Sequence, residues 1–138
     1  MTDLYLDANI FIFAALGRSD DPRCEKAKKF LLDIIDCKKT GCTSTLTVDE
    51  VVWTIIKQKK DRALAIAQGL RLHQLPVRMI AASEKIMIRS LHLMQKYPQL
   101  SPRDAIHAAS CIESGAKSLV SDDSDFKEIK EVQWTGLF

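Results

Sequence analysis

Apolar residues recur along the chain in two patterns. In the longer stretches they repeat every three or four positions, which is the period of an amphipathic helix. Short apolar runs bounded by polar or turn residues separate these stretches and predict strands. The predicted helices are 8–16, 23–38, one that opens at Thr47, 62–72, 82–96 and 102–114. The predicted strands are 4–6, 41–44, 76–80 and 118–120, with a last edge strand at 132–134.

Strands and helices therefore alternate along the chain. This order favours an α/β fold, in the form of a three-layer α/β/α sandwich. We expect its central, mostly parallel sheet to have four to five strands. A length of 138 residues predicts that positions 1–138 form a single domain.

Composition narrows the class of protein. A hydrophobic content of 46% and a charged content of 28% are typical of a folded globular chain and exclude a disordered one. No apolar run approaches the roughly 20 residues that span a bilayer, so no membrane association is expected. The first residues lack the basic region of a signal peptide, and we expect a cytoplasmic location. No cysteine pair has zinc-site spacing, so buried free thiols are expected. The cysteines are Cys24, Cys37, Cys42 and Cys111.

The helix predicted to begin after Ser101 has a well-marked start and end. Ser101 is a good N-cap, and Pro102 falls at the first helical position, where a missing N–H has no consequence. Asp104 falls at the third position, near the positive end of the helix dipole. Gly115 is a natural residue to end the helix. This helix therefore carries a carboxylate at its first turn.

Further acidic residues follow strands or open helices. Asp7 comes directly after the first strand, and Glu50 falls in a predicted capping box that opens with Thr47. A group of acids, Asp122 to Asp125, follows the fourth strand. Ligands bind outside the carboxyl ends of parallel strands, so we expect these acids to meet there. Each acid alone has another reading as a helix cap or a turn residue.

Carboxylates that converge on one pocket repel each other and hold protons at neutral pH. A hard divalent cation removes this repulsion, and Mg²⁺ or Mn²⁺ prefers carboxylate and water oxygens. Such an ion activates water for attack on a phosphodiester, and two ions about 4 Å apart are known in nucleases. The number of ions stays open. A reaction of this kind needs no serine, cysteine or histidine nucleophile.

Four stretches together resemble the PIN-domain ribonucleases, and most closely the single-domain VapC-like toxins of toxin–antitoxin pairs. The stretches are Leu6-Asp7-Ala8-Asn9-Ile10, Thr47-Val48-Asp49-Glu50-Val51, Ser101-Pro102-Arg103-Asp104-Ala105-Ile106-His107-Ala108-Ala109 and Leu119-Val120-Ser121-Asp122-Asp123-Ser124-Asp125-Phe126. The last two are the more specific. The resemblance implies that four catalytic acids hold Mg²⁺ or Mn²⁺, with Asp125 as a further metal ligand. These acids are Asp7, Glu50, Asp104 and Asp123.

The fourth acid is ambiguous in the sequence. Asp122 stands beside Asp123, so either carboxylate fits the local pattern. The family spacing of a hydroxyl residue, an acid and a phenylalanine is met by Ser121, Asp123 and Phe126, and it favours Asp123. Ser121 stands where the family often has threonine, and serine keeps the hydroxyl that supports the site. Asp49 beside Glu50 leaves a similar but smaller ambiguity.

Two other residues are supporting candidates. Asn9 is expected either to orient Asp7 or a bound water, or to serve as a plain turn or cap residue. His107 follows Asp104 by one helical turn, and a packed histidine with a satisfied hydrogen bond is the favoured interpretation.

The resemblance implies an endoribonuclease that cleaves single-stranded RNA with a metal-activated water. It also implies a homodimer and a protein antitoxin that lies across the active-site groove. A basic cluster either steers the RNA backbone or forms a solvated helix face. This cluster is Lys57, Lys59, Lys60 and Arg62.

Other functions stay open at this point. A toxin and an RNA-processing factor have the same site pattern. A catalytically silent PIN-like RNA-binding or scaffolding protein would keep the fold without the chemistry. A Mg²⁺-binding phospho-acceptor signalling domain also gathers acids at strand ends, but it needs an acidic pair after the first strand, where Asp7 is nearly alone.

Overall fold

The computed structural model describes residues 3–137 and contains one five-stranded sheet in the order β3-β2-β1-β4-β5. All neighbouring strands are parallel. The strands are β1 (Leu4–Leu6), β2 (Gly41–Ser44), β3 (Val77–Ile80), β4 (Ser118–Ser121) and β5 (Trp134–Gly136). The helices are α1 (Ala8–Leu16), α2 (Pro22–Ile35), α3 (Thr45–Lys59), α4 (Arg62–Gln74), α5 (Glu84–Lys96), α6 (Pro102–Ser114) and the 3₁₀ helix η1 (Ser124–Glu128).

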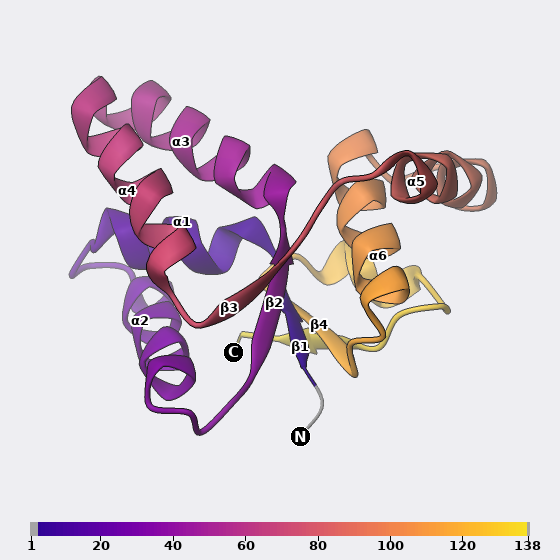
Figure 1. Ribbon diagram of the computed structural model, residues 1–138, viewed down its shortest axis with the longest axis horizontal. Helices are drawn as coiled ribbons and strands as arrows, with labels where there is room; N and C mark the ends of the chain where they lie inside the picture. Colours follow the sequence, from indigo (N-terminus) through magenta and orange to yellow (C-terminus); the bar gives the residue numbers. More distant parts are fainter. Residues whose placement is uncertain (1–2, 138) are drawn as a thin grey trace.

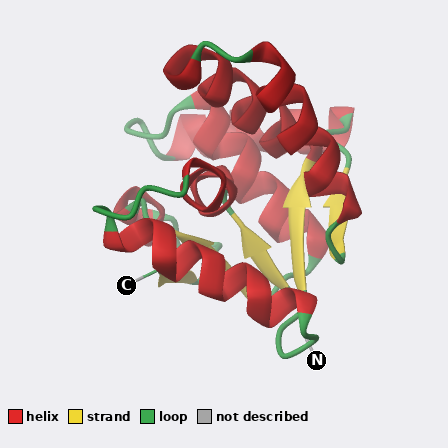
Figure 2. Cartoon of the chain, turned by 90° about the vertical axis from the view of Figure 1, so that its left-hand side faces the viewer, coloured by secondary structure: helices red, strands yellow, loops and turns green. Residues whose placement is uncertain are grey.

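The helices lie on both faces of the sheet. Figure 1 shows α1 to α4 on one side of the strands and α5 and α6 on the other, and Figure 2 shows the first group in front of the sheet. Each face buries its own apolar core, one around Tyr5 and Phe126 and the other around Leu6 and Ile10. This arrangement confirms the predicted three-layer α/β/α fold. None of the helices in residues 3–137 is long and apolar enough to cross a membrane.

The N-cap of helix α3 lies three residues before the predicted one. Ser44 is its N-cap and accepts a hydrogen bond from the backbone N–H of Leu46 at 3.0 Å. The hydroxyl of Thr47 is buried and lies 2.6 Å from the hydroxyl of Thr43 instead. The predicted capping box was therefore wrong, and Glu50 lies inside the helix rather than in its first turn.

Other element boundaries also differ from the prediction. Helix α2 ends at Ile35, before the predicted 38, because Cys37 adopts a left-handed conformation with φ of 60°. The last strand lies at Trp134–Gly136 rather than at 132–134. Cys37 is also exposed, whereas the other three cysteines are buried as expected.

Helix α6 has the predicted start and end. The Ser101 hydroxyl accepts from the backbone N–H of Asp104 at 3.3 Å, and Pro102 is the first helical residue. Gly115 ends the helix in a left-handed conformation with φ of 73°, which glycine adopts without strain. Because α6 returns the chain to the start of the parallel strand β4, its first turn lies at the carboxyl edge of the sheet.

Candidate active site

Asp7 lies where the two central strands end side by side. It follows β1, and its backbone N–H donates to the carbonyl of Val120 in β4 at 3.0 Å. One carboxylate oxygen accepts from the backbone N–H of Ala8 at 2.8 Å, and the other accepts from the Ser121 hydroxyl at 2.7 Å. Burial raises the pKa of Asp7, although the charge of His107 and these hydrogen bonds oppose the rise. Asp7 therefore caps α1 and also places a buried carboxylate at this edge.

The Ser121 hydroxyl connects three residues of the site. It accepts from the Asn9 side-chain amide at 3.1 Å and from the backbone N–H of Asp123 at 2.9 Å. Since it donates to Asp7, its hydrogen-bonding capacity is fully used. Asn9 therefore supports Asp7 through Ser121 rather than by direct contact.

The neighbouring acids Asp122 and Asp123 have different partners. Asp122 lies 3.3 Å from the guanidinium of Arg23 in α2, which also pairs with Asp21. Asp123 is the N-cap of η1, and one of its oxygens accepts from the backbone N–H of Asp125 at 2.9 Å. The negative charge of Asp123 also raises the pKa of the carboxyl of Asp104. The Asp125 side chain is exposed.

The carboxyl of Asp104 is strongly perturbed by its surroundings. Burial, followed by the negative charges of Asp7 and Asp123, raises its pKa to about 6. Ser101 and His107 act in the opposite direction. The shift shows that carboxylates from β1, α6 and the loop after β4 lie within electrostatic reach of one another.

Glu50 reaches the site from α3 and is held by His107. Its carboxylate lies 2.5 Å from Nε2 of His107, which also lies 3.5 Å from Asp7. An ionised carboxylate only accepts, so Nε2 is the donor. The Tyr5 hydroxyl lies 2.7 Å from the other ring nitrogen. Burial lowers the pKa of His107, but the hydrogen bond to Glu50 and the charges of the nearby acids outweigh it and raise the pKa overall.

The sequence did not reveal the part played by Tyr5. His107 lay one turn after Asp104 and was predicted to be packed and hydrogen-bonded, which agrees with a fully buried ring. Its partners are nevertheless the acids themselves. The contact between Tyr5 and His107 joins positions 102 residues apart, so no local pattern indicates it. Asp49, the alternative to Glu50, is exposed.

The donor chemistry of the site fits a hard divalent cation, because all four acids offer carboxylate oxygens. The negative charges of Asp7 and Asp123 add to burial in raising the pKa of Asp104, and a bound cation would offset them. In residues 3–137, however, no three His, Cys, Asp or Glu side chains lie close enough to hold a metal ion as they stand. Glu50 instead directs one oxygen at His107.

Comparison with known proteins identifies the family. Residues 4–132 match the PIN domain, so the chain belongs to the PIN domain family. No curated protein matches the chain significantly.

Solved structures of toxin–antitoxin proteins share the fold. The chain resembles VapBC2 from Rickettsia felis bound to a promoter DNA fragment, with a TM-score of 0.72, 20% identity and coverage of 96% of this chain and 97% of that one. A toxin–antitoxin complex from Klebsiella pneumoniae has a TM-score of 0.69 at 24% identity and covers 99% and 98%. Mycobacterium tuberculosis VapC20, a toxin that cleaves the sarcin-ricin loop, has a TM-score of 0.71 at 20% identity and covers 93% and 95%.

Proposed function

We propose that the chain acts as one domain and is a divalent-metal-dependent endoribonuclease that cleaves single-stranded RNA. The observation that carries the proposal is the gathering of Asp104 with Asp7 and Asp123 at one edge of the sheet, where burial, followed by the negative charges of these two acids, raises the pKa of Asp104 to about 6. Carboxylates that only cap helices would not need to lie buried together, where burial and mutual repulsion destabilise their ionised forms. Membership of the PIN domain family supports the same activity.

Each acid is oriented by its own part of the fold. Ser121 holds Asp7 and the backbone of Asp123, and Asn9 holds Ser121 in turn. His107 fixes one oxygen of Glu50. Asp104 projects from the first turn of α6. We propose that a bound Mg²⁺ or Mn²⁺ is held by these four acids, with Asp125 as a further ligand at the edge of the site.

The metal would supply Lewis acidity, which lowers the pKa of water and stabilises charge on the phosphate during displacement. The chain would supply the orientation. Because Ser121 and His107 fix the carboxylates before substrate arrives, little reorganisation is needed when RNA binds. His107 donates to the acids and takes no direct part in the displacement.

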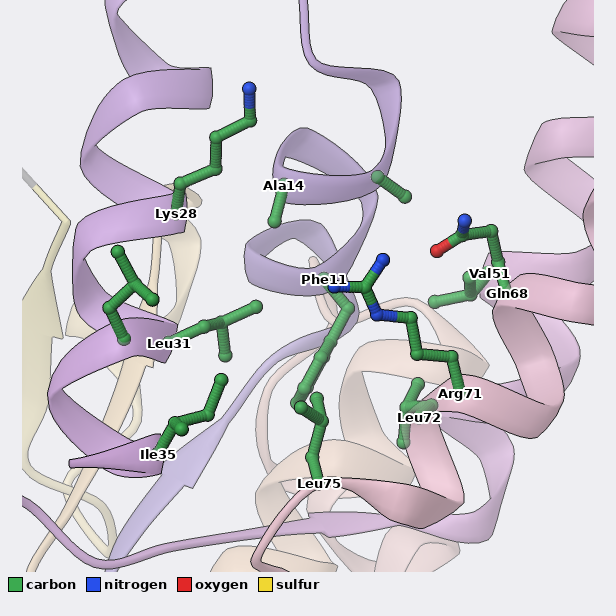
Figure 3. A pocket seen from close by; sticks show the side chains of 12 residues that line it. Phe11, Ala14, Lys28, Leu31, Ile35, Val51, Gln68, Arg71, Leu72 and Leu75 are labelled. Atoms are coloured by element: carbon green, nitrogen blue, oxygen red, sulfur yellow. The ribbon is translucent and has the colours of Figure 1, made fainter. Parts of the chain in front are cut away.

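We further propose that the protein is the toxin of a toxin–antitoxin pair. Similar folds occur in toxin–antitoxin complexes. An apolar groove of about 320 Å³ lies between α1, α2 and α4, where Leu31 and Ile35 face Leu72 across Phe11 (Figure 3). Arg71 lines the groove and makes no ion pair within residues 3–137. This groove suits an antitoxin segment with apolar anchors and an acidic side chain.

The experiment that tests the nuclease is cleavage of a mixed single-stranded RNA with Mn²⁺, Mg²⁺ or EDTA. Wild type should cleave in either metal and not in EDTA. Asp104→Asn should lose at least about a hundredfold in rate, because it removes a charge from the site. Asp49→Asn is the matched control, since Asp49 is an exposed acid of α3 that makes no contact with the site.

Equal cleavage by wild type and Asp104→Asn would contradict the proposal, and so would cleavage that persists in EDTA. The toxin role has a separate test in cells. Expression of wild type should arrest growth, whereas expression of Asp104→Asn should not. Growth unaffected by a protein that cleaves RNA in vitro would favour an RNA-processing role.

A further inference from the structure

Trp53 lies on the open face of α3, one turn beyond Glu50. Its side chain is 53% exposed, although indole is usually buried in a folded domain. The other indole, that of Trp134, is half-buried and donates to the carbonyl of Ser121 at 3.2 Å. Trp53 makes no hydrogen bond within residues 3–137. An exposed aromatic surface therefore stands directly beside the acidic site.

One lysine continues the same face of the helix, and a second follows at the helix end. With about 100° between successive helical residues, Glu50, Trp53 and Lys57 fall within an arc of about 60°, and at about 1.5 Å of rise per residue Lys57 lies about 10 Å further along the axis than Glu50. Lys60 is the C-cap of α3 in a left-handed conformation with φ of 54°, so it lies just past the last helical residue. Trp53, Lys57 and Lys60 are here called the α3 stripe. The stripe begins at the acids and leads away from them.

The cations of the stripe are not neutralised by the chain itself. Lys57 and Lys60 are exposed and make no ion pair in the described part of the chain. Lys85 and Lys96, by contrast, pair with acids of neighbouring elements at 3.1 and 3.3 Å. The nearest acid in sequence, Asp61, caps α4 by accepting from the backbone N–H of Leu64. The stripe therefore offers positive charge to a partner from outside.

We propose that the α3 stripe is the surface that binds the single-stranded RNA on its way into the acidic site. One base stacks on the indole of Trp53, and phosphates beyond it contact Lys57 and Lys60. Single-stranded nucleic acids are held by this combination of aromatic stacking and cationic contacts. The inference rests on the proposed nuclease function and adds to it a binding surface for the substrate.

Charge complementarity favours RNA over an apolar protein partner. A protein that covered Trp53 with apolar side chains would also desolvate the free ammonium groups of Lys57 and Lys60, and unpaired buried charges are costly. RNA complements both the ammonium groups and the indole, because it brings a phosphate for each ammonium and a base to stack on the indole. The stripe also starts where the scissile phosphate has to lie.

The test measures binding of a fluorescein-labelled, mixed-sequence single-stranded RNA oligonucleotide by anisotropy, in EDTA so that no cleavage occurs. Trp53→Leu should weaken binding about fivefold or more, which is the lower end of a stacking contribution. Trp53→Phe should recover most of the affinity because it restores an aromatic face. An apolar protein interface would instead tolerate leucine. Circular dichroism should show both variants folded, since Trp53 is on the surface.

The double variant Lys57→Gln/Lys60→Gln should weaken binding and reduce the slope of log Kd against log salt by about 1.4, or about 0.7 for each lost phosphate contact. Lys117→Gln is the matched control. Lys117 is exposed and lies before β4, at the opposite edge of the sheet, so its removal should leave the slope unchanged.

Wild-type affinity in Trp53→Leu would overturn the proposal, whatever that variant does to self-association. An unchanged salt slope in the double lysine variant would overturn it as well. Because binding is measured without metal, failure of the two ideas can be separated. If the protein binds RNA through the stripe but cleaves no RNA, only the proposed nuclease function is contradicted. If the stripe variants cleave RNA as well as wild type does, only the proposed binding surface is contradicted.

Discussion

The ionised carboxylate of Asp104 destabilises the fold in the absence of metal. Its pKa is raised to about 6 in the folded protein by burial and by the charges of Asp7 and Asp123, whereas an unfolded aspartate has a pKa of about 3.9. The folded state therefore binds this proton more tightly. The contribution of Asp104 to the free energy of unfolding falls as the pH rises from about 4 to about 6.

We therefore expect Asp104→Asn to raise the Tm in EDTA by a few degrees at about pH 7.5 and by less at about pH 4.5. Scanning calorimetry at the two pH values measures the difference. Asp49→Asn, an exposed acid on α3, should change the Tm little at either pH. If Asp104→Asn did not raise the Tm at the higher pH, the coupling of the acids would be contradicted.

Tyr5 acts on the site through His107. Tyr5→Phe removes the hydroxyl 2.7 Å from the buried ring nitrogen, which should lower the free energy of unfolding by about 1–3 kcal/mol. It should also lower kcat for RNA cleavage while RNA affinity stays near wild type, because the histidine that orients Glu50 loses its anchor. Urea unfolding and single-turnover cleavage measure the two effects.

Tyr97→Phe is the control for this variant. The Tyr97 hydroxyl donates to Glu131 at 2.5 Å at the far end of α5 and is also partly buried. Its loss should reduce stability to a similar degree and leave cleavage unchanged. If cleavage falls equally in both tyrosine variants, the effect of Tyr5 is only structural.

At the scale of elements, α3 and α4 approach each other closely at a glycine. A methyl group added at Gly69 would lie 2.8 Å from Cγ2 of Val52. Alanine favours a helix by about 1 kcal/mol over glycine, but overpacking costs about 1–3 kcal/mol. The Val52 side chain cannot easily turn away, because valine has one strongly preferred χ1 rotamer in a helix. Gly69→Ala should therefore lower the free energy of unfolding by about 1 kcal/mol.

A double-mutant cycle isolates this contact. Val52→Ala removes the methyl group that obstructs the new side chain, so Gly69→Ala should be neutral or stabilising in that background. Denaturant unfolding of the four proteins measures the coupling. A stabilising effect of Gly69→Ala in the wild-type background would show that the two helices are less tightly packed than described.

Most helices and strands could be predicted from the sequence because the features that determine them lie within or next to each element. Stripes of apolar residues, Pro102 and Gly115 fix helices without reference to the rest of the chain. The start of α3 was missed because Ser44 and Thr47 are both suitable caps. The contact between Thr47 and Thr43 decides between them, and it depends on how the strand meets the helix.

The same limit applies to the site. The order of strands and helices in the sequence predicted that the four acids lie at one edge of the sheet. The sequence left Asp122 and Asp123 ambiguous, because the partner of Asp122 is Arg23, which lies 99 residues away. The sequence predicted a packed histidine, but its partners come from two distant parts of the chain, Tyr5 and Asp7 at the end of β1 and Glu50 in α3.

At the scale of the whole molecule, we propose that two copies associate through α5. Met87, Ile88 and Leu91 are 40%, 50% and 60% exposed on this helix. Wild type should sediment as a dimer and Leu91→Glu as a folded monomer, because a charge is poorly tolerated in an apolar interface. Leu70→Glu, at an equally exposed position of α4, should remain a dimer. A wild-type monomer at micromolar concentration would contradict this arrangement.

We propose that distant parts of the chain jointly form a metal site, and a titration with Mn²⁺ followed by electron paramagnetic resonance measures binding of the ion. The signal of free Mn²⁺ should be depleted by wild type and by Asp49→Asn. It should be depleted far less by Asp104→Asn, because one of the four coupled acids is then uncharged. Absence of Mn²⁺ binding by wild type, or equal binding by Asp104→Asn, would contradict the proposed metal site.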